Sequence, residues 1–515
     1  MKPDRADPLF TLVKSLDRNE KGYFKKFAAR YGEKHSGNIY LRIFDTLDKM
    51  DIYDEQKFIS KFTEKGGARI NLSAQKKYLH QQILKSLRAY YSGKNLRYTL
   101  TEKLLDAQNL LDKNLTQEAL ETLQYITETS INESFSDIAI SALLQMEALM
   151  QRQWGVFTTE QISNVKKRIG EALVKLQQEH HLSNLLYEMK LLDDERGRQD
   201  VVDTSLMQKV DALMADELLQ NPEALTPRGK MLAYGIFQID AAIRGDDRRA
   251  LHYMILRHHL MENLGTDRLS LTAYLANVSN IIMACLNIGD VNEASKFLQI
   301  LEKNTYREKN AEAYRRHVLA KNTLMYLMVK SISGITAQEV RNAEAMYLNT
   351  NPQPAGNNNL MSAYYLAILY YCVGERDKSI FWLEQVTQYK NVSYINVQAY
   401  CKILMAYLYM ESKQVSLAVS NIHAATYFMR KHKISSPFLR GCLQIANKLV
   451  SALGKNQFRI LLEGCEQKFA ELFTRELRGE VTYFHDFNLM LWSRAMRQGT
   501  SYAKELQKQG SLAAV

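Results

Sequence analysis

One local pattern recurs along the chain and restricts its fold more than any other feature. A short turn is followed by a small residue and, four positions later, by an apolar residue. The small residues are Ala119, Ala250, Ala294, Ser379 and Ala418, and the apolar ones are Leu123, Met254, Leu298, Leu383 and Ile422. Residues four apart share one face of an α-helix, and a small side chain lets a neighbouring helix approach closely. The pattern therefore predicts consecutive pairs of antiparallel helices.

The pattern resembles the tetratricopeptide repeat, a helix-turn-helix unit of about 34 residues. The resemblance covers residues 98–435 and implies a right-handed α-solenoid, in which each helix pair packs on the next. From Ala250 onward the aligned small residues are 44, 85 and 39 positions apart, so the helices are longer than in that family. The interval of 85 predicts an additional unit around residues 336–339. The whole chain also resembles a group of uncharacterised bacterial proteins with such repeats, which implies no activity.

Composition and helix-start signals both favour an all-α fold. The 515 residues include only 7 prolines and 23 glycines, below the average usage of about 5% and 7%. Four capping pairs predict helix starts at Asp17–Glu20, Thr158–Gln161, Asp290–Glu293 and Thr336–Glu339. Three more starts follow from a capping residue before proline, at Asp7-Pro8, Thr226-Pro227 and Ser436-Pro437. The cluster of breakers at 351–359 predicts a joint within the solenoid.

The charge distribution separates the N-terminus from the rest of the chain. Residues 1–100 hold 21 basic and 11 acidic side chains, whereas residues 101–515 hold 46 and 45. We expect a basic N-terminal module at 1–97, with helices at 8–16, 18–31, 39–50, 54–62 and 73–92. The repeats follow at 98–437, and capping helices at 438–515. In the last part, Leu489, Leu491 and Trp492 belong to an amphipathic segment that we expect to cover the final repeat.

The basic module is a candidate for nucleic-acid binding. Residues 54–62 and 73–92 are consistent with a helix-turn-helix whose second helix is basic. Its candidate basic patch consists of Lys61, Lys65, Arg69, Lys76, Lys77, Lys85 and Arg88. A solvated helix face that merely begins the solenoid would give the same pattern, and the loop between the two helices exceeds the usual 3–4 residues. Both interpretations stay open at this point.

The first helices of two repeats carry a candidate peptide groove. In tetratricopeptide arrays the first helix of each pair lines the concave side, and this alignment selects Tyr364, Ile368, Tyr371, Tyr400, Ile403 and Tyr407. Aromatic rings with polar tips suit a peptide groove. The alternative is that these side chains pack between adjacent helices, as a stripe at helical spacing usually does. Asn277 and Asn280 lack lysine partners on their own face, so we do not expect capture of a terminal carboxylate.

Motifs for catalysis or for binding metals and cofactors are absent from the sequence. There is no phosphate-binding loop and no nucleophile elbow. His258, His259 and Glu262 share a helix, but no second ligand cluster accompanies them. The five cysteines are scattered, which predicts reduced thiols in a cytoplasmic protein. The longest apolar run, 363–373, is shorter than the roughly 18 residues of a membrane span.

Three functional hypotheses follow. The first is a non-enzymatic scaffold that binds a protein or peptide partner on a helical-repeat solenoid. The second is a DNA-binding regulator, in which residues 1–97 bind DNA and the solenoid senses a peptide. The third is an enzyme of unrecognised type. We expect no cofactor, no metal and no membrane segment, and the sequence does not indicate an oligomeric state.

Overall fold

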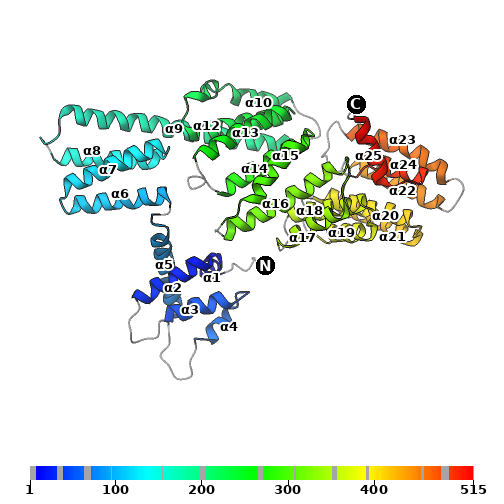
Figure 1. The fold of residues 1–515 in the computed structure, drawn as a ribbon, viewed down its shortest axis with the longest axis horizontal. Coiled ribbons are helices and arrows are strands. Elements are labelled where there is room, and N and C mark those ends of the chain that lie inside the picture. Colours follow the sequence, from blue (N-terminus) through cyan, green and yellow to red (C-terminus); the bar gives the residue numbers. More distant parts are fainter. Residues whose placement is uncertain are drawn as a thin grey trace.

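The computed structural model describes residues 7–31, 39–62, 71–93, 95–153, 155–196, 204–264, 271–306, 309–350, 357–389, 394–453, 458–476 and 487–513. Every regular element within these ranges is a helix (Figure 1). The expected all-α class is therefore confirmed. None of the described helices combines the length and apolarity needed to cross a membrane.

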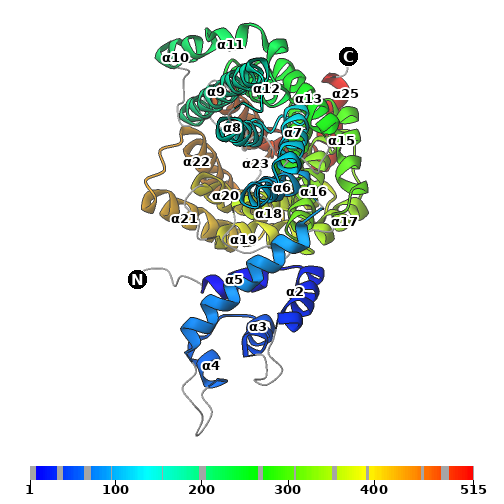
Figure 2. The ribbon, with the colours of Figure 1, turned by 90° about the vertical axis from the view of Figure 1, so that its left-hand side faces the viewer.

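The N-terminal module consists of five helices, and each begins and ends within two residues of the expected boundary. They are α1 (Pro8–Ser15), α2 (Arg18–Tyr31), α3 (Ile39–Lys49), α4 (Glu55–Ser60) and α5 (Leu72–Tyr91). Helix α5 packs against α1, α2 and α3. Their common core contains Leu9, Val13, Phe24, Ile43, Phe44, Leu47, Phe58, Leu79 and Ile83. The module projects from the side of the solenoid (Figures 1 and 2).

Consecutive helix pairs make up the body of the molecule. The pairs are α6 (Leu96–Asp112) with α7 (Thr116–Asn132), α8 (Ser136–Arg152) with α9 (Thr159–Arg196), α12 (Pro227–Ile243) with α13 (Asp247–Leu264), α14 (Leu271–Asn287) with α15 (Val291–Lys303), α16 (Lys309–Lys330) with α17 (Ala337–Leu348), α18 (Asn357–Cys372) with α19 (Arg376–Gln388), α20 (Ile395–Glu411) with α21 (Val415–Lys431) and α22 (Pro437–Ala452) with α23 (Phe458–Glu476). Each pair contacts the next, so the body is an α-solenoid. Short helices α10 (Thr204–Met214) and α11 (Glu217–Gln220) follow α9, while α24 (Leu489–Gln498) and α25 (Tyr502–Ala513) follow α23.

The additional unit expected between Ala294 and Ser379 is present. It is the pair α16–α17, and α17 begins with a full capping box. Thr336 accepts a hydrogen bond from the Glu339 backbone N–H at 3.3 Å, and Glu339 accepts one from the Thr336 N–H at 2.8 Å. The predicted joint at 351–359 falls mainly on residues outside the described ranges, and α18 begins at Asn357.

One turn geometry explains the recurring sequence pattern. The residue five positions before each small residue is left-handed, with φ between 57° and 80°, at Asn114, Gly245, Gly289, Gly374 and Lys413. The next N–H donates to the carbonyl five positions back at 2.8–2.9 Å, which satisfies a free carbonyl at the helix end. The five small residues are buried. A sixth copy, Ser134 with Ala139, joins α7 to α8.

The predicted helix starts are also observed. Asp7, Thr226 and Ser436 each accept hydrogen bonds from backbone N–H groups in the first turn of the helix that follows. The pairs Asp17–Glu20 and Thr158–Gln161 bond reciprocally. Asp290 accepts from the Glu293 N–H at 2.9 Å. These contacts are local, which is why the sequence alone could place them.

The helix pairs curve around an axis, and their two members have different positions. Viewed along the solenoid, α16, α18 and α20 lie toward the axis, whereas α17, α19 and α21 form the outside (Figure 2). The first helix of each of these pairs therefore provides the inner face of the solenoid. A partner enclosed by the curve would meet these first helices.

Candidate binding surface on the inner face

The structure places the six expected groove residues in the core. Tyr364, Ile368 and Tyr371 lie on α18, and Tyr400, Ile403 and Tyr407 on α20; Tyr371 is 8% exposed and the other five are at most 2% exposed. All six belong to one large cluster of buried apolar residues. The groove expectation is corrected accordingly: these side chains pack between helices, as the alternative interpretation held.

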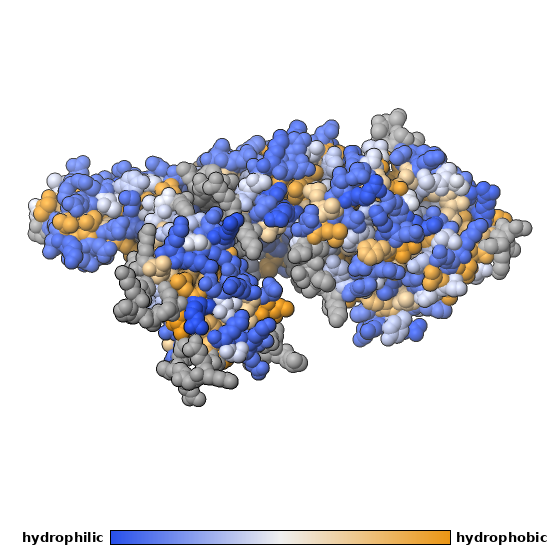
Figure 3. Space-filling view, turned by 60° about the horizontal axis from the view of Figure 1, so that its bottom comes forward, coloured by the Kyte–Doolittle hydropathy of each residue, from blue (hydrophilic) through white to orange (hydrophobic). Residues whose placement is uncertain are grey.

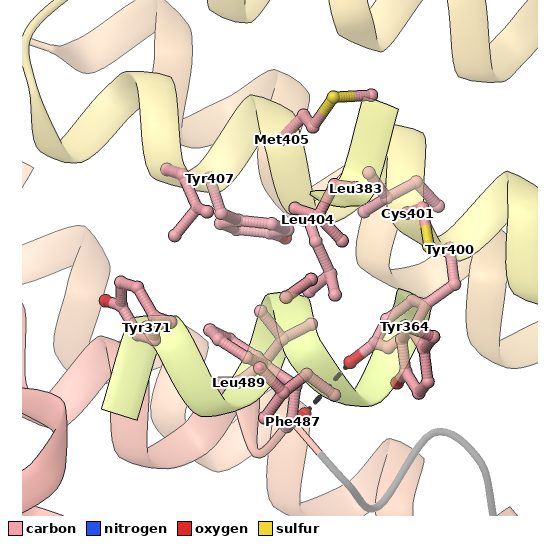
Figure 4. Close-up of a cluster of buried hydrophobic side chains, with 14 of the residues drawn as sticks. Tyr364, Tyr371, Leu383, Tyr400, Cys401, Leu404, Met405, Tyr407, Phe487 and Leu489 are labelled. Carbon is pink, nitrogen blue, oxygen red and sulfur yellow. Dashed lines mark hydrogen bonds between the residues drawn. The ribbon is translucent and has the colours of Figure 1, made fainter. Parts of the chain in front are cut away.

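The C-terminal segment of the chain covers this part of the inner face. The Tyr400 hydroxyl donates to the carbonyl of Phe487 at 3.0 Å, and the Tyr407 ring lies edge-on to Trp492 with centroids 4.8 Å apart. Tyr371 contacts the rings of both Phe487 and Tyr502, at 5.1 and 5.2 Å. Figure 4 shows Phe487 and Leu489 facing the tyrosines of α18 and α20. Residues 487–513 thus do more than cover the final repeat, because they reach back to α18.

The tyrosines in this cluster act as neutral hydrogen-bond donors. The Tyr407 hydroxyl donates to the Cys442 carbonyl at 2.7 Å, and the Tyr371 hydroxyl donates to Glu411 Oε2 at 2.8 Å. Burial raises the pKa of both phenols well above the ordinary value, because the charged phenolate would be desolvated. The polar tips that suited a peptide groove are therefore already bonded within the chain.

A sequence signal for this burial exists in the composition of the two helices. Helices α18 and α20 carry apolar or aromatic residues on every side, and most of their described side chains are buried. A helix that is apolar all round is normally surrounded by protein. What covers it was not apparent from the sequence, because Phe487 is 87 positions away from Tyr400.

Helix α14, the first helix of its pair, keeps one side exposed. On α14, Ala273, Asn280 and Asn287 are exposed, and Ala276 and Met283 are partly exposed. These positions follow one another at intervals of three or four, so they form a single stripe along the helix. Apart from Met283, the stripe consists of alanine and asparagine side chains, in contrast to the apolar surface of α18 and α20.

A lysine from the next repeat lies beside this stripe. Lys321 on α16 places its Nζ atom 3.6 Å from Met283 Sδ, and Met283 lies three positions after Asn280. Burial lowers the pKa of Lys321, and no carboxylate among the described residues opposes that effect. Burial and the nearby Lys321 charge also lower the pKa of His317, one turn earlier. Lys321 is thus a partly buried cation that has no counter-ion among the described residues.

The environment of the two asparagines explains why the sequence did not reveal this lysine. Asn277 is buried, and its amide donates to the Met254 carbonyl at 3.4 Å, whereas Asn280 is exposed. Neither has a lysine on its own helix, as expected. Lys321 approaches α14 from the adjacent repeat. Its position beside Asn280 could therefore be predicted only from an alignment of neighbouring repeats.

A pocket of about 510 Å³ lies where α25 meets the ends of α18 and α20. Tyr371, Cys372, Arg376, Glu411, Ser501 and Tyr502 line it. The Tyr371 hydroxyl is bonded to Glu411, and burial raises the pKa of the Cys372 thiol to about 12. The thiol therefore stays protonated at neutral pH and is a poor nucleophile.

Of the two neighbouring histidines on α13, His258 is part of the structural core, whereas His259 is exposed. His258 is 2% exposed, stacks on Tyr274 with ring centroids 5.4 Å apart and contacts Phe297 at 5.3 Å. Its Nε2 atom lies 3.3 Å from Glu262 Oε1. Within the described ranges, no group of three or more His, Cys, Asp or Glu side chains is arranged to hold a metal ion.

The residues of the candidate basic patch have different environments. Lys61, Lys77, Lys85 and Arg88 are exposed, and Lys65 and Arg69 lie outside the described residues. Lys76 is used internally: its Nζ lies 2.7 Å from both Asp7 Oδ2 and the Tyr53 hydroxyl, and its side chain is 18% exposed. The expectation that Lys76 meets phosphates is corrected, because the ion pair holds the start of α5 against α1.

The expected helix-turn-helix of 54–62 and 73–92 is not a tight helix pair. Helix α4 has only six residues and reaches the module core through Phe58. Helix α5 packs instead against α1, α2 and α3. Any role of α5 in binding must therefore depend on the face that it turns away from these helices.

Comparisons with known proteins identify no family for this chain. No protein-family model matches it, and no curated protein does. Among solved structures, the apo form of the quorum sensor NprR from B. thuringiensis is similar with a TM-score of 0.41 and 12% sequence identity. The match covers 71% of this chain and 99% of that one. A likeness this distant supports no conclusion about function.

Proposed function

We propose that this protein is a non-enzymatic scaffold that binds a protein or peptide segment on the inner face of α14 and α16. The unpaired Lys321 beside the stripe of α14 is the observation that carries the proposal. A partly buried ammonium group without a counter-ion is unfavourable, and a carboxylate from a partner would relieve it. We therefore expect the bound segment to carry an acidic group.

The small side chains of the stripe support the same site. Ala273 and Ala276 let a backbone approach α14 closely, and Asn280 and Asn287 can donate and accept hydrogen bonds. The C-terminal helices supply an internal precedent, because the chain's own residues 487–513 occupy the equivalent face of α18 and α20. We propose that α14 and α16 hold a segment from another molecule in the corresponding position.

The cysteines support a reducing compartment for this scaffold. Cys285, Cys372, Cys401, Cys442 and Cys465 are all buried free thiols. Burial raises the pKa of Cys285 to about 11, which keeps that thiol protonated. Intracellular proteins commonly keep their thiols in this reduced form, and we propose a cytoplasmic location.

Selection of short random peptides against the full-length protein tests the proposed site. Selected peptides are then titrated by fluorescence anisotropy against the wild type and two variants. Ala276→Arg places a long side chain in the stripe and should abolish binding. Lys321→Met should weaken the binding of acidic peptides roughly tenfold or more, since a hydrogen bond to a charged group contributes about 1.5–3 kcal/mol.

A matched control uses a lysine on the outer side of the same part of the solenoid. Lys303 is exposed at the end of α15, so Lys303→Met should leave peptide affinity unchanged. Selected peptides that bind Ala276→Arg as tightly as the wild type would rule out this site. A selection that returns no peptide would also count against the proposal.

A further inference from the structure

The strongest unassigned charge feature of the molecule is centred on α5. No acidic residue occurs between Glu64 and Glu102, whereas this interval holds eight lysines and arginines. Helix α5 lies entirely within it. The local field around α5 is therefore set by cations from its own segment, and acidic groups reach it only from other helices of the module.

One side of α5 packs against the module core, and the opposite side faces solvent. Leu79, Ile83 and Ser86 are buried against the module core. Lys77, Gln81, Lys85 and Arg88 are exposed, and their spacing of four, four and three residues places them in a row on the opposite side. At 1.5 Å per residue the row extends over about 16 Å of the helix.

The module pairs three of its cations with carboxylates, but none of the cations in this row is paired in that way. Lys21 pairs with Asp48 at 2.6 Å, Lys25 with Asp45 at 2.7 Å, and Lys76 with Asp7 at 2.7 Å. By contrast, Lys77, Lys85 and Arg88 make no side-chain hydrogen bond or ion pair with any described residue. The carboxylates of Asp7, Asp45 and Asp48 are thus committed elsewhere, and the three cations of the row face solvent.

A regular row of unpaired cations is complementary to a phosphate backbone. We propose that the exposed face of α5 binds the backbone of duplex DNA, a function beyond the peptide scaffold and independent of it. An α-helix of about 10–12 Å diameter fits a major groove of about 12 Å. Because the row offers mainly charge, its contacts would position the protein without selecting a base sequence.

The composition of the row favours duplex DNA over two other polyanionic partners. Single strands are usually held by aromatic side chains that stack on bases. The row itself contains none, and the exposed ring beside it, Tyr78, packs on Tyr40 with ring centroids 5.4 Å apart. A helix that lies on an anionic membrane needs a broad apolar face. Only Leu84, at 37% exposure, and Tyr78, at 42%, are large apolar side chains of α5 exposed beside the row. They do not form a broad apolar face, because the apolar side of α5 is buried in the module.

Fluorescence anisotropy with a labelled duplex of mixed sequence tests the proposal on the full-length protein. The variant Lys77→Glu, Lys85→Glu, Arg88→Glu should lose at least tenfold in affinity at low salt. Three lost phosphate contacts should also reduce the slope of log affinity against log salt by about 2.7. Circular dichroism should show unchanged helix content.

A control with the same change in net charge isolates the position of the row. Lys166, Lys190 and Lys303 are exposed on α9 and α15, so changing all three to Glu should leave most of the DNA affinity intact. The proposal is overturned if the wild type fails to bind duplex at low salt, or if the two triple variants weaken binding equally. Tighter binding to single-stranded DNA, duplex RNA or phosphatidylserine vesicles than to duplex DNA would overturn the assigned partner. Peptide titrations of the α5 variant separate this outcome from failure of the inner-face site.

Discussion

The inner face of the solenoid differs between α14–α16 and α18–α20, although both regions are built from the same repeating pair. In both, a left-handed residue ends the first helix of a pair and a buried small residue follows five positions later. At α18 and α20 the inner surface is apolar and the chain's own C-terminal helices cover it. At α14 the corresponding surface consists mainly of alanine and asparagine side chains, and it stays exposed. Repeat geometry thus positions a face, and the residues on that face decide whether it is covered.

The hydrophilic outer surface of the molecule is consistent with the need to cover α18 and α20. In Figure 3, hydrophilic side chains cover most of the visible surface, with hydrophobic ones scattered among them. Scattered apolar residues are normal for a protein surface. The large apolar faces of α18 and α20 would be exceptional if they were exposed, which gives the C-terminal helices a structural role.

Removal of Trp492 should have the largest effect on the covered region. Trp492 is fully buried beside Tyr407, and truncation of a buried aromatic residue costs about 3–5 kcal/mol. Trp492→Ala should lower the free energy of unfolding of the C-terminal half by that amount, measured by urea denaturation. Phe381→Ala on the outer face, where the ring is 50% exposed, should have little effect. Equal effects would mean that the C-terminal helices are not integral to the core.

Loss of one hydroxyl should loosen the same contact more selectively. Tyr400→Phe removes the donor to the Phe487 carbonyl, and an unsatisfied buried acceptor costs roughly 1–3 kcal/mol. Hydrogen exchange should become faster in residues 487–513 while α14 and α16 keep wild-type rates. Tyr427→Phe on α21, where the ring is 68% exposed, serves as the control. Faster exchange at α14 would show that the two regions are coupled.

The shared turn predicts opposite effects at two positions, one in each region. Gly289 has φ of 79° and an added Cβ would meet no atom within 4 Å, so Gly289→Ala should destabilise by about 1 kcal/mol through backbone strain alone. Lys413 has φ of 57°, and Lys413→Gly should be neutral or slightly stabilising, by about 0.5 kcal/mol. Thermal unfolding measures both. Stabilisation by Gly289→Ala would contradict the account of the turn.

A small pH effect should come from the unit that joins the two regions. Lys330 and the Thr336 backbone lower the pKa of Glu339 to about 2 from its ordinary value of 4.5. A depressed pKa contributes stability above about pH 4.5, and this contribution is lost as the pH falls toward 2. Glu339→Gln should therefore be less stable than the wild type at pH 7, and the difference should shrink from pH 5 to pH 2. A difference that is constant with pH would exclude this ion pair as the cause.

The elements that the sequence predicted well are those set by local contacts. Capping residues such as Thr336 and turn residues such as Gly289 act within a few positions, and their helices begin and end where expected. The copy at Ser134 and Ala139 was not predicted, although it has the same left-handed turn residue and buried small residue as the others. The N-terminal helices were predictable because their apolar periodicity and their caps agree.

The candidate site depended on contacts that the sequence does not reveal. Whether Tyr400 and Tyr407 line a groove or the core is decided by Phe487 and Trp492, which follow after another helix pair. From the sequence Lys76 is expected to be a free cation, whereas the structure places Asp7 beside it. In both cases a side chain far along the chain changes the environment, and periodicity carries no information about such a neighbour.

Thiol labelling under native conditions tests the difference between the two inner faces most directly. One variant carries Asn280→Cys on α14 and the other Ile403→Cys on α20, and the five native thiols are buried and serve as an internal baseline. We predict that the cysteine at 280 reacts rapidly with a polar maleimide and that the one at 403 stays protected until the protein unfolds. Rapid labelling at 403, or protection at 280, would contradict the account.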